Sequence, residues 1–172
     1  MRKIILNLAV TLDGFIEGSN GEYDWCFTDQ DYGMKQFFEE VDTVIYGRKS
    51  YELVTSMEGG LDQFPKMKNY VFSKTLQTAP PEATLVSIDP KTFVASIRNE
   101  PGKDIWLFGG AELAAAFLEQ GLVDVFWLSV HPILLGSGKL LFPQGNGRTQ
   151  LELIECKAYD SGLVSLKYQR KQ

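Results

Sequence analysis

Three short polar segments, each placed directly after an apolar run, hold the residues that could do chemistry. The first is the Gly-Gly-Ala-Glu segment 109–112, which follows the apolar run 105–108 and opens an amphipathic helix expected over 112–120. A strand that becomes a helix through two glycines leaves uncovered N–H groups at the positive end of the helix dipole, which suits a phosphate or pyrophosphate. A tight turn that binds nothing would need the same glycines, and the three-glycine dinucleotide fingerprint is absent.

The second segment, Gly-Arg-Lys-Ser at 47–50, joins the apolar run 43–46 to a helix expected over 50–57. Cations are unfavourable at a helix N-terminus, so their presence is explained if an anion binds there and is shared with backbone N–H groups and the serine hydroxyl. Side chains that simply point to water are the alternative. The third segment, Ser-Lys-Thr at 73–75, is another polar and basic strand end.

Two single side chains are candidates for proton transfer. Asp31 lies near the start of a helix expected over 28–42, where apolar residues recur with the spacing of an amphipathic helix. Its carboxylate could donate a proton or anchor a ligand, or it could cap the helix. His131 is the only histidine and ends a long apolar strand, so it is either an acid–base group or a structural residue.

The composition limits the classes of protein to which the chain can belong. Its 172 residues fit one domain (1–172), and 44% hydrophobic and 23% charged residues are ordinary for a globular protein. A net charge of −5 argues against nucleic acid as a partner. The apolar run 4–10 is too short for a membrane span or a signal peptide, so we expect a cytoplasmic protein without a membrane partner. Two isolated cysteines and one histidine predict no metal and no disulfide framework.

The order of the expected elements predicts the fold class. About eight strands alternate mostly with four helices, and the last two strands, 151–159 and 163–170, flank an Asp-Ser-Gly hairpin signal. This pattern predicts an α/β protein, a three-layer α/β/α sandwich on a mixed, mainly parallel eight-stranded sheet with an antiparallel C-terminal hairpin. The three polar segments would then gather at the carboxyl edge of the sheet, where open α/β sheets bind ligands.

With these segments in place, the sequence resembles the dihydrofolate reductase-like superfamily. More closely, it resembles stand-alone relatives of the C-terminal reductase domain of the bacterial bifunctional riboflavin biosynthesis protein. The stretch FGGAELAAAFLEQGLVDVFWLSVHPILLGSGKLLF looks like that family's Gly-Gly strand–helix, Leu-Val-Asp strand and Pro-x-Leu-Leu-Gly-x-Gly turn. LAVTLDGFI is similar to its opening strand and Asp-Gly turn, and YGRKSYE looks like the Gly-Arg-x-Ser/Thr-aromatic-Glu motif of dihydrofolate reductases.

The resemblance implies the cofactor NADPH. Family members place the pyrophosphate at the Gly-Gly helix start, the adenosine phosphates beside the Gly-Arg segment, and the adenine ribose beside the third segment. The nicotinamide lies against the first strand and the loop that follows. The basic residues would favour NADPH over NADH by meeting its 2′-phosphate. The implied cofactor-binding residues are Ala9, Val10, Ile16, Gly47, Arg48, Lys49, Ser50, Ser73, Lys74, Thr75, Phe108, Gly109, Gly110, Ala111 and Glu112.

The resemblance also implies a reaction, the NADPH-dependent reduction of a pyrimidine- or pteridine-type heterocycle. The first expected substrate is 5-amino-6-(5-phosphoribosylamino)uracil. Dihydrofolate is the alternative, because Asp31 matches the spacing to Gly47 of the acid that dihydrofolate reductases carry. Riboflavin-pathway enzymes usually have a lysine and a glutamate where this chain has Asn7 and Phe108. A non-catalytic NADPH-binding module and a structural domain without ligand therefore stay open.

Homodimerisation is expected from the same likeness. The long apolar run 123–130 could supply the interface, but a strand buried inside the sheet would have the same composition.

Overall fold

A computed structural model describes residues 1–143 and 147–171. Strands and helices alternate through the first three quarters of the chain, and the last elements are strands. The elements are β1 (Ile4–Thr11), β2 (Phe15–Glu17), α1 (Met34–Glu40), β3 (Val41–Gly47), α2 (Arg48–Ser56), the 3-10 helix η1 (Gly60–Gln63), β4 (Lys68–Phe72), β5 (Thr84–Val86), α3 (Pro90–Ile97), β6 (Asp104–Gly109), α4 (Ala111–Glu119), β7 (Val125–His131), β8 (Lys139–Leu140), β9 (Leu151–Ala158) and β10 (Val164–Arg170).

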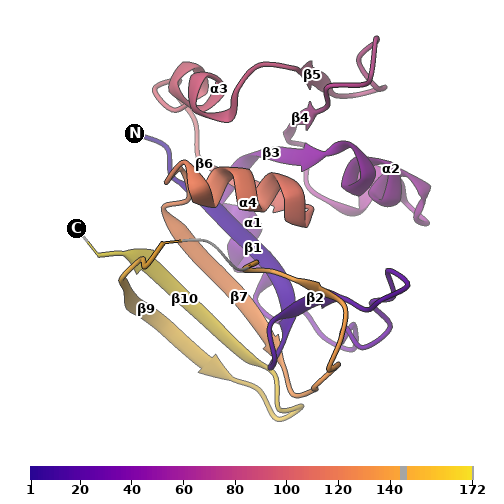
Figure 1. Cartoon of the computed structure of the whole chain (residues 1–172), viewed down its shortest axis with the longest axis vertical. Helices are drawn as coiled ribbons and strands as arrows, with labels where there is room; N and C mark the ends of the chain where they lie inside the picture. The colour runs from indigo at the N-terminus through magenta and orange to yellow at the C-terminus, as the bar shows by residue number, and fades with distance from the viewer. Residues whose placement is uncertain (144–146, 172) are drawn as a thin grey trace.

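The described residues form one eight-stranded sheet in the order β5-β4-β3-β6-β1-β7-β10-β9 (Figure 1). The first six strands in this order are parallel, and β10 runs antiparallel to both β7 and β9. The predicted mixed sheet with an antiparallel C-terminal hairpin is confirmed. The short strands β2 and β8 pair with each other beside the end of β1.

Helices cover the sheet on two faces, because successive residues of each strand point to opposite sides. On the first face, α3 and α4 pack over Ile4, Leu6 and Leu107, and Phe117 of α4 is fully buried there. On the second face, α1 and α2 pack over the alternate residues of the same strands. Figure 1 shows α4 in front of the sheet and α1 behind it. The result is the three-layer arrangement that the sequence predicts.

The helix predicted over 28–42 is wrong at both ends, since α1 begins only at Met34 and residues 41 and 42 already belong to β3. Tyr32 and Gly33 both have positive φ angles, of 49° and 86°, which an α-helix does not allow. The ring of Tyr32 packs against that of Tyr159, with the centroids 4.9 Å apart, and its hydroxyl donates a hydrogen bond to Asp29. Contacts with the distant C-terminal hairpin therefore override the helical pattern.

The apolar strand that offered a candidate interface is β7, an interior strand of the sheet. It pairs with β1 along one edge and with β10 along the other. Val125, Phe126 and Trp127 are buried in it. Its apolar character is therefore explained by the core. In the described part of the chain, no helix is both long and apolar enough to cross a bilayer.

Candidate functional site

The parallel strands bring the three polar segments to one edge of the sheet. β4, β3, β6 and β1 are neighbours in this order, so the residues that follow them lie side by side at their carboxyl ends. The register places Gly47 beside Phe72 and Tyr46 beside Gly109. Segment 47–50 therefore lies between segments 73–75 and 109–112.

The two glycine turns of this edge touch each other. A Cβ atom at Gly47 would lie 3.5 Å from both the carbonyl oxygen of Gly109 and the nitrogen of Gly110, and a Cβ at Gly110 would lie 3.1 Å from Oγ of Ser50. Gly109 has a φ of 103° and open space on its Cβ side, and the Gly109–Gly110 peptide is cis. The two turns thus pack closely against each other through their glycines, with the Ser50 hydroxyl beside the contact and open space next to Gly109.

Hydrogen-bond donors are concentrated at this meeting point. α2 begins at Arg48 and α4 at Ala111, and the first N–H groups of a helix have no acceptor within it. Neither N-cap residue, Gly47 or Gly110, supplies a side-chain cap. The two helix N-termini and the hydroxyl of Ser50 therefore offer an anion a set of donors with the favourable sign of the dipole.

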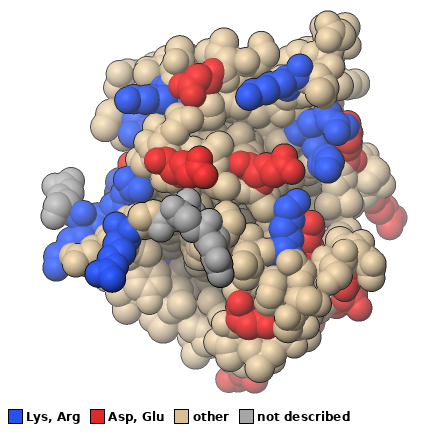
Figure 2. Space-filling view, viewed as in Figure 1, with Lys and Arg blue, Asp and Glu red and all other residues tan. Residues whose placement is uncertain are grey.

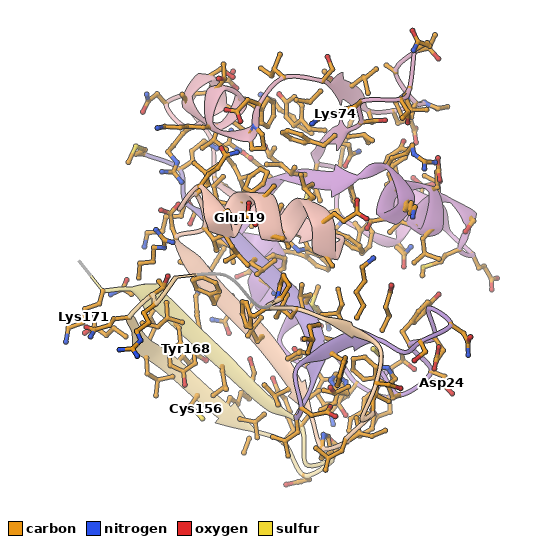
Figure 3. The ribbon with its side chains drawn as sticks, viewed as in Figure 1. Asp24, Lys74, Glu119, Cys156, Tyr168 and Lys171 are labelled. Carbon is orange, nitrogen blue, oxygen red and sulfur yellow. The ribbon has the colours of Figure 1, made fainter. Side chains whose placement is uncertain are left out.

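The charged side chains around these donors are exposed or half-exposed. Arg48 pairs with Glu52 at 2.8 Å within α2, and Lys49 and Lys74 are exposed. Figure 3 shows Lys74 beside β4. Glu112, in the first turn of α4, is exposed and adds a negative charge at the same edge. Positive side chains thus come from both basic segments, with the carboxylates of Glu52 and Glu112 beside them.

Ser73 has its own local role in the third segment. Its hydroxyl oxygen accepts hydrogen bonds from the backbone N–H groups of Thr75 and Leu76, at 3.2 and 3.1 Å. This closes the turn after β4 and fixes the direction in which the following lysine leaves the sheet. Thr75 is exposed at this turn.

The side chains expected beside a nicotinamide do not all share one face. Val10 is buried in the first-face core and Ile16 of β2 packs against the same core, whereas Ala9 points to the second face. Phe108 also lies on the second face, in an aromatic cluster with Tyr46 and Trp106 at centroid distances of 5.0 Å. The end of β1 therefore presents different surfaces on its two sides.

Tyr46 is a polar residue of this region that the sequence analysis missed. It is fully buried, and its hydroxyl is without a partner among the described residues. Burial raises the pKa of this phenol, with the neighbouring Tyr51 as a smaller cause. Tyr46 lies one residue before the Gly-Arg segment. Because it belongs to the apolar run 43–46, the sequence pattern indicated a core residue and not a polar group of the site.

Asp13 was also missed, and it connects two loops at the end of β1. Its carboxylate accepts hydrogen bonds from the Thr11 hydroxyl at 2.6 Å and from the N–H groups of Leu135 and Gly136 at 3.2 and 2.8 Å. The Thr11 hydroxyl is the main cause of a lowered pKa at Asp13, and the two N–H groups add to it. This contact holds the loop after β1 against the turn after β7.

His131 has both ring nitrogens engaged in structural contacts. Nε2 accepts a hydrogen bond from the N–H of Phe27 at 3.1 Å, and Nδ1 lies 3.0 Å from the carbonyl oxygen of Ser129. A neutral ring protonated at Nδ1 satisfies both contacts. The residue is buried, and this burial lowers its pKa. These contacts favour the structural interpretation of His131.

Asp31 lies in the segment ahead of α1 and not in the helix itself. It is exposed, and its two carboxylate oxygens accept hydrogen bonds from the N–H groups of Gly33 and Lys35, both at 3.1 Å. The same segment contacts His131 and Tyr159 through neighbouring side chains, which places it on the other side of β1 from the three polar segments. The structure thus gives Asp31 a capping role.

Two cavities lie away from the meeting point of the turns. One of about 330 Å³ is at the amino edge, beside Arg2, Arg98 and Gly102. The other, of about 340 Å³, lies between Cys26 to Asp29 and Ser161, next to the segment that carries Asp31. Among the described residues there is no cluster of three or more histidine, cysteine or acidic side chains that could hold a metal ion.

Comparison with known proteins gives a consistent set of relatives. The family model of the RibD C-terminal domain matches residues 2–165. The uncharacterized protein YyaP of Bacillus subtilis strain 168 is 42% identical over 177 residues, 97% of this chain and 94% of YyaP. The crystal structure of a putative riboflavin biosynthesis protein from Shewanella sp. PV-4 has a TM-score of 0.85 at 25% identity, with both chains fully covered.

A more distant solved structure shares the fold. The diaminohydroxyphosphoribosylaminopyrimidine deaminase/5-amino-6-(5-phosphoribosylamino)uracil reductase of Thermotoga maritima has a TM-score of 0.74 at 13% identity. The match covers 99% of this chain and 57% of that one, so the present chain corresponds to one part of the longer enzyme.

Proposed function

The chain belongs to the RibD C-terminal domain family, and from this premise we propose that it is an NADPH-dependent reductase of a pyrimidine- or pteridine-type heterocycle. Its fold is that of the riboflavin-biosynthesis reductase domains. The observation that carries the proposal is the contact between the two glycine turns, where Gly110 lies against Ser50 and Gly47 against Gly109.

The residues at this contact fit a dinucleotide. Gly109 has open space on its Cβ side, directly beside the contact of Gly47 with Gly110, and the N-termini of α2 and α4 begin at this contact. Backbone N–H groups of Ala111 and Glu112 with the Ser50 hydroxyl would hold the pyrophosphate. Arg48 and the exposed lysines 49 and 74 would hold the remaining phosphates, and the 2′-phosphate would account for a preference for NADPH.

The chain's own residues then position and protect the reacting ring. When bound, NADPH supplies the hydride. Asp13 holds the loop after β1 against the turn after β7, and this loop leads from Ala9 on the second face to Ile16 on the first. Phe108 and its aromatic neighbours exclude water from the second face. For the proton, the candidate in our proposal is the carboxylate of Asp31.

The first proposed substrate is 5-amino-6-(5-phosphoribosylamino)uracil, the compound named for the Thermotoga relative, and dihydrofolate is the alternative. A second function, a nucleotide-binding module without turnover, is favoured by one observation. Asp31 already accepts two backbone hydrogen bonds as a cap, on the other side of β1 from the glycine turns.

The test measures binding and turnover separately. NADPH and NADH are titrated by calorimetry, and consumption of NADPH is followed with each of the two substrates. We expect NADPH to bind more tightly than NADH and the aminouracil to be reduced. Reduction of dihydrofolate alone would correct the substrate. Tight binding without turnover of any pyrimidine or pterin would support the binding module, and no binding of either nucleotide would contradict the whole proposal.

A further inference from the structure

The cavity at the amino edge of the sheet has two arginines in its wall. Its volume of about 330 Å³ is within the range of small-molecule sites. The wall is formed by the residues just ahead of β1 and by the connection between α3 and β6. The side chains that matter here are those of Arg2, Arg98, Asn99, Glu100 and Asp104. The reductase mechanism proposed above uses none of them.

Arg2 is buried and fixed by its surroundings, with only 5% of the residue exposed. Its Nε donates to the carbonyl oxygen of Lys103, and its Nη2 donates to the Asp42 carboxylate and the Thr43 hydroxyl. A Cβ at Gly102 would lie 3.2 Å from Cζ of Arg2, so the glycine leaves the space that the guanidinium needs. These bonds leave the N–H groups of Nη1 without a partner among the described residues, at a side chain that lines the cavity.

Arg98 is fixed in a similar way. Its Nη2 donates to the carbonyl oxygen of Leu122 at 3.0 Å and to the carboxylate of Asp124 at 2.6 Å. Its Nε is buried and has no partner in the part of the chain that the structure describes. The backbone joins the two arginines, since the N–H of Arg2 donates to the carbonyl oxygen of Arg98 at 3.0 Å. Two guanidinium groups with unused donors therefore line one cavity.

The positive charge at this edge exceeds the acceptors that the described residues supply. Four buried side-chain polar atoms lack a partner there, and two of them are Nε of Arg98 and Nε of Arg170. Arg170 ends β10 beside the same turn and donates to the carbonyl oxygen of Gly121 at 3.2 Å. Figure 2 shows lysine and arginine side chains on the left side of the molecule, where Figure 1 places the start of β1 and the end of β10. A guanidinium only donates hydrogen bonds, so these groups favour an anionic ligand.

We propose that this cavity binds a sugar phosphate. A phosphate group matches the fork of N–H donors that a guanidinium presents, and two such groups line the cavity. The rest of the wall carries acceptors, which are the carboxylates of Glu100 and Asp104 and the amide of Asn99. Sugar hydroxyls can donate to these oxygens. A bare anion would leave the acceptors unmatched, and a neutral sugar would leave the guanidinium groups unmatched.

The two carboxylates do not cancel the attraction for a phosphate. Glu100 forms an ion pair with Lys68 at 3.6 Å, which offsets its charge. Asp104 accepts a hydrogen bond from the backbone N–H of Lys3 at 2.7 Å through one oxygen, which leaves its second oxygen for a hydroxyl. The anionic and the hydroxyl-bearing parts of the ligand thus each have their own side of the cavity.

The cavity is separate from the proposed nucleotide site. Asp104 and Gly109 are the two ends of β6, which has six residues. At about 3.3 Å per residue the strand separates them by roughly 17 Å. Asp104 lines the cavity, whereas Gly109 lies at the contact of the two glycine turns. The sugar phosphate therefore binds at the edge of the sheet opposite to the nucleotide site and does not depend on it.

Calorimetric titration with three probes tests the class of ligand. Ribose 5-phosphate is expected to bind at one site per chain. Inorganic phosphate should bind at least about tenfold more weakly, because it leaves the acceptors of the wall unmatched, and ribose alone should give no binding. Absence of ribose 5-phosphate binding overturns the proposal. Equal affinity for inorganic phosphate, or for ribose, overturns the assignment to a sugar phosphate.

A substitution in the wall tests the location. The Asn99 side chain makes no hydrogen bond within the described residues, so Asn99→Asp should keep the melting temperature. The new carboxylate faces the phosphate and should raise the Kd for ribose 5-phosphate at least about tenfold. Asn20→Asp makes the same change of charge on the exposed loop after β2 and is the matched control, with unchanged affinity. Equal affinities of the two variants would refute the location.

Competition with NADPH distinguishes this inference from the proposed function. Saturating NADPH should leave the Kd for ribose 5-phosphate unchanged, and displacement of ribose 5-phosphate by NADPH would place both ligands in one site and overturn the inference. A chain that binds ribose 5-phosphate in an Asn99-dependent way but binds no NADPH would support the amino-edge site and contradict only the proposed function.

Discussion

The contrast between Arg48→Gln and Glu52→Gln is the most direct check on the proposed nucleotide site. Arg48 and Glu52 form one ion pair on the surface of α2, 2.8 Å apart, with side chains 37% and 54% exposed. Exposed pairs with this spacing contribute about 0.3–0.5 kcal/mol to stability. Either substitution removes the same pair, so both variants should lose the same small amount of stability.

Their effects on nucleotide binding should differ. A hydrogen bond from a charged group contributes about 1.5–3 kcal/mol, which corresponds to roughly a tenfold to 150-fold change in Kd. Arg48→Gln should therefore weaken NADPH binding by this factor. Glu52→Gln releases Arg48 from its intrahelical partner and removes a negative charge, so NADPH should bind equally well or more tightly.

Isothermal titration calorimetry with NADPH and NADH, together with the melting temperature of each variant, measures these quantities. If Arg48 meets the 2′-phosphate, its loss weakens NADPH and leaves NADH unchanged, whereas a contact with the pyrophosphate weakens both. Unchanged NADPH binding in Arg48→Gln would refute the reasoning. Equal weakening in both variants would mean that the ion pair acts only through the stability of α2.

Three further predictions concern other residues of the site and of its surroundings. Gly47→Ala should leave the melting temperature unchanged or raise stability by about 0.4–1 kcal/mol, because its φ of −73° suits alanine and the new methyl makes ordinary contacts at 3.5 Å; calorimetry should at the same time show weaker NADPH binding, and unchanged affinity would place the nucleotide elsewhere. Asp31→Asn keeps one side-chain oxygen that can accept the capping hydrogen bonds. If Asp31 supplies the proton, kcat should fall about a hundredfold, and an unchanged kcat would leave Asp31 only as a cap. The pKa of His131 is lowered in the folded state, so the natural chain should have its full stability above about pH 6.5 and lose stability as the pH falls below that value. Denaturant melts of His131→Gln should lack this acid-side loss, and identical pH profiles for the two proteins would contradict the assigned contacts.

Local signals predicted most of the fold. The apolar runs predicted most strands of the parallel part of the sheet, and the polar segments that follow them predicted the starts of α2 and α4. Because the carboxyl ends of parallel strands share one edge, the sequence also predicted that the three polar segments would be neighbours. These inferences depend on residues that are close together in the chain.

The errors and omissions depend on contacts between distant residues. The start of α1 is set by the packing of Tyr32 on Tyr159, and the role of Asp13 by N–H groups more than 120 residues away. In β9 the pairing with β10 shifts so that Leu153 lies beside Tyr168 and Glu155 beside Lys167, and the extra residue Ile154 forms a bulge that no local pattern of apolar and polar residues indicates. In each of these cases the local pattern was compatible with several structures, and the tertiary contact selected one.

The central place of β1 in the sheet has a consequence for how the chain folds during synthesis. β1 is made first, but its neighbours β6 and β7 begin only at residues 104 and 125. At about 5–20 residues per second, a ribosome needs roughly 5–20 s to reach the first of them. During that time β3, β4 and β5, which are consecutive neighbours, can already pair with one another, whereas the first strand stays without a partner. The nascent chain must therefore keep its most apolar N-terminal residues from aggregating until its second half has emerged.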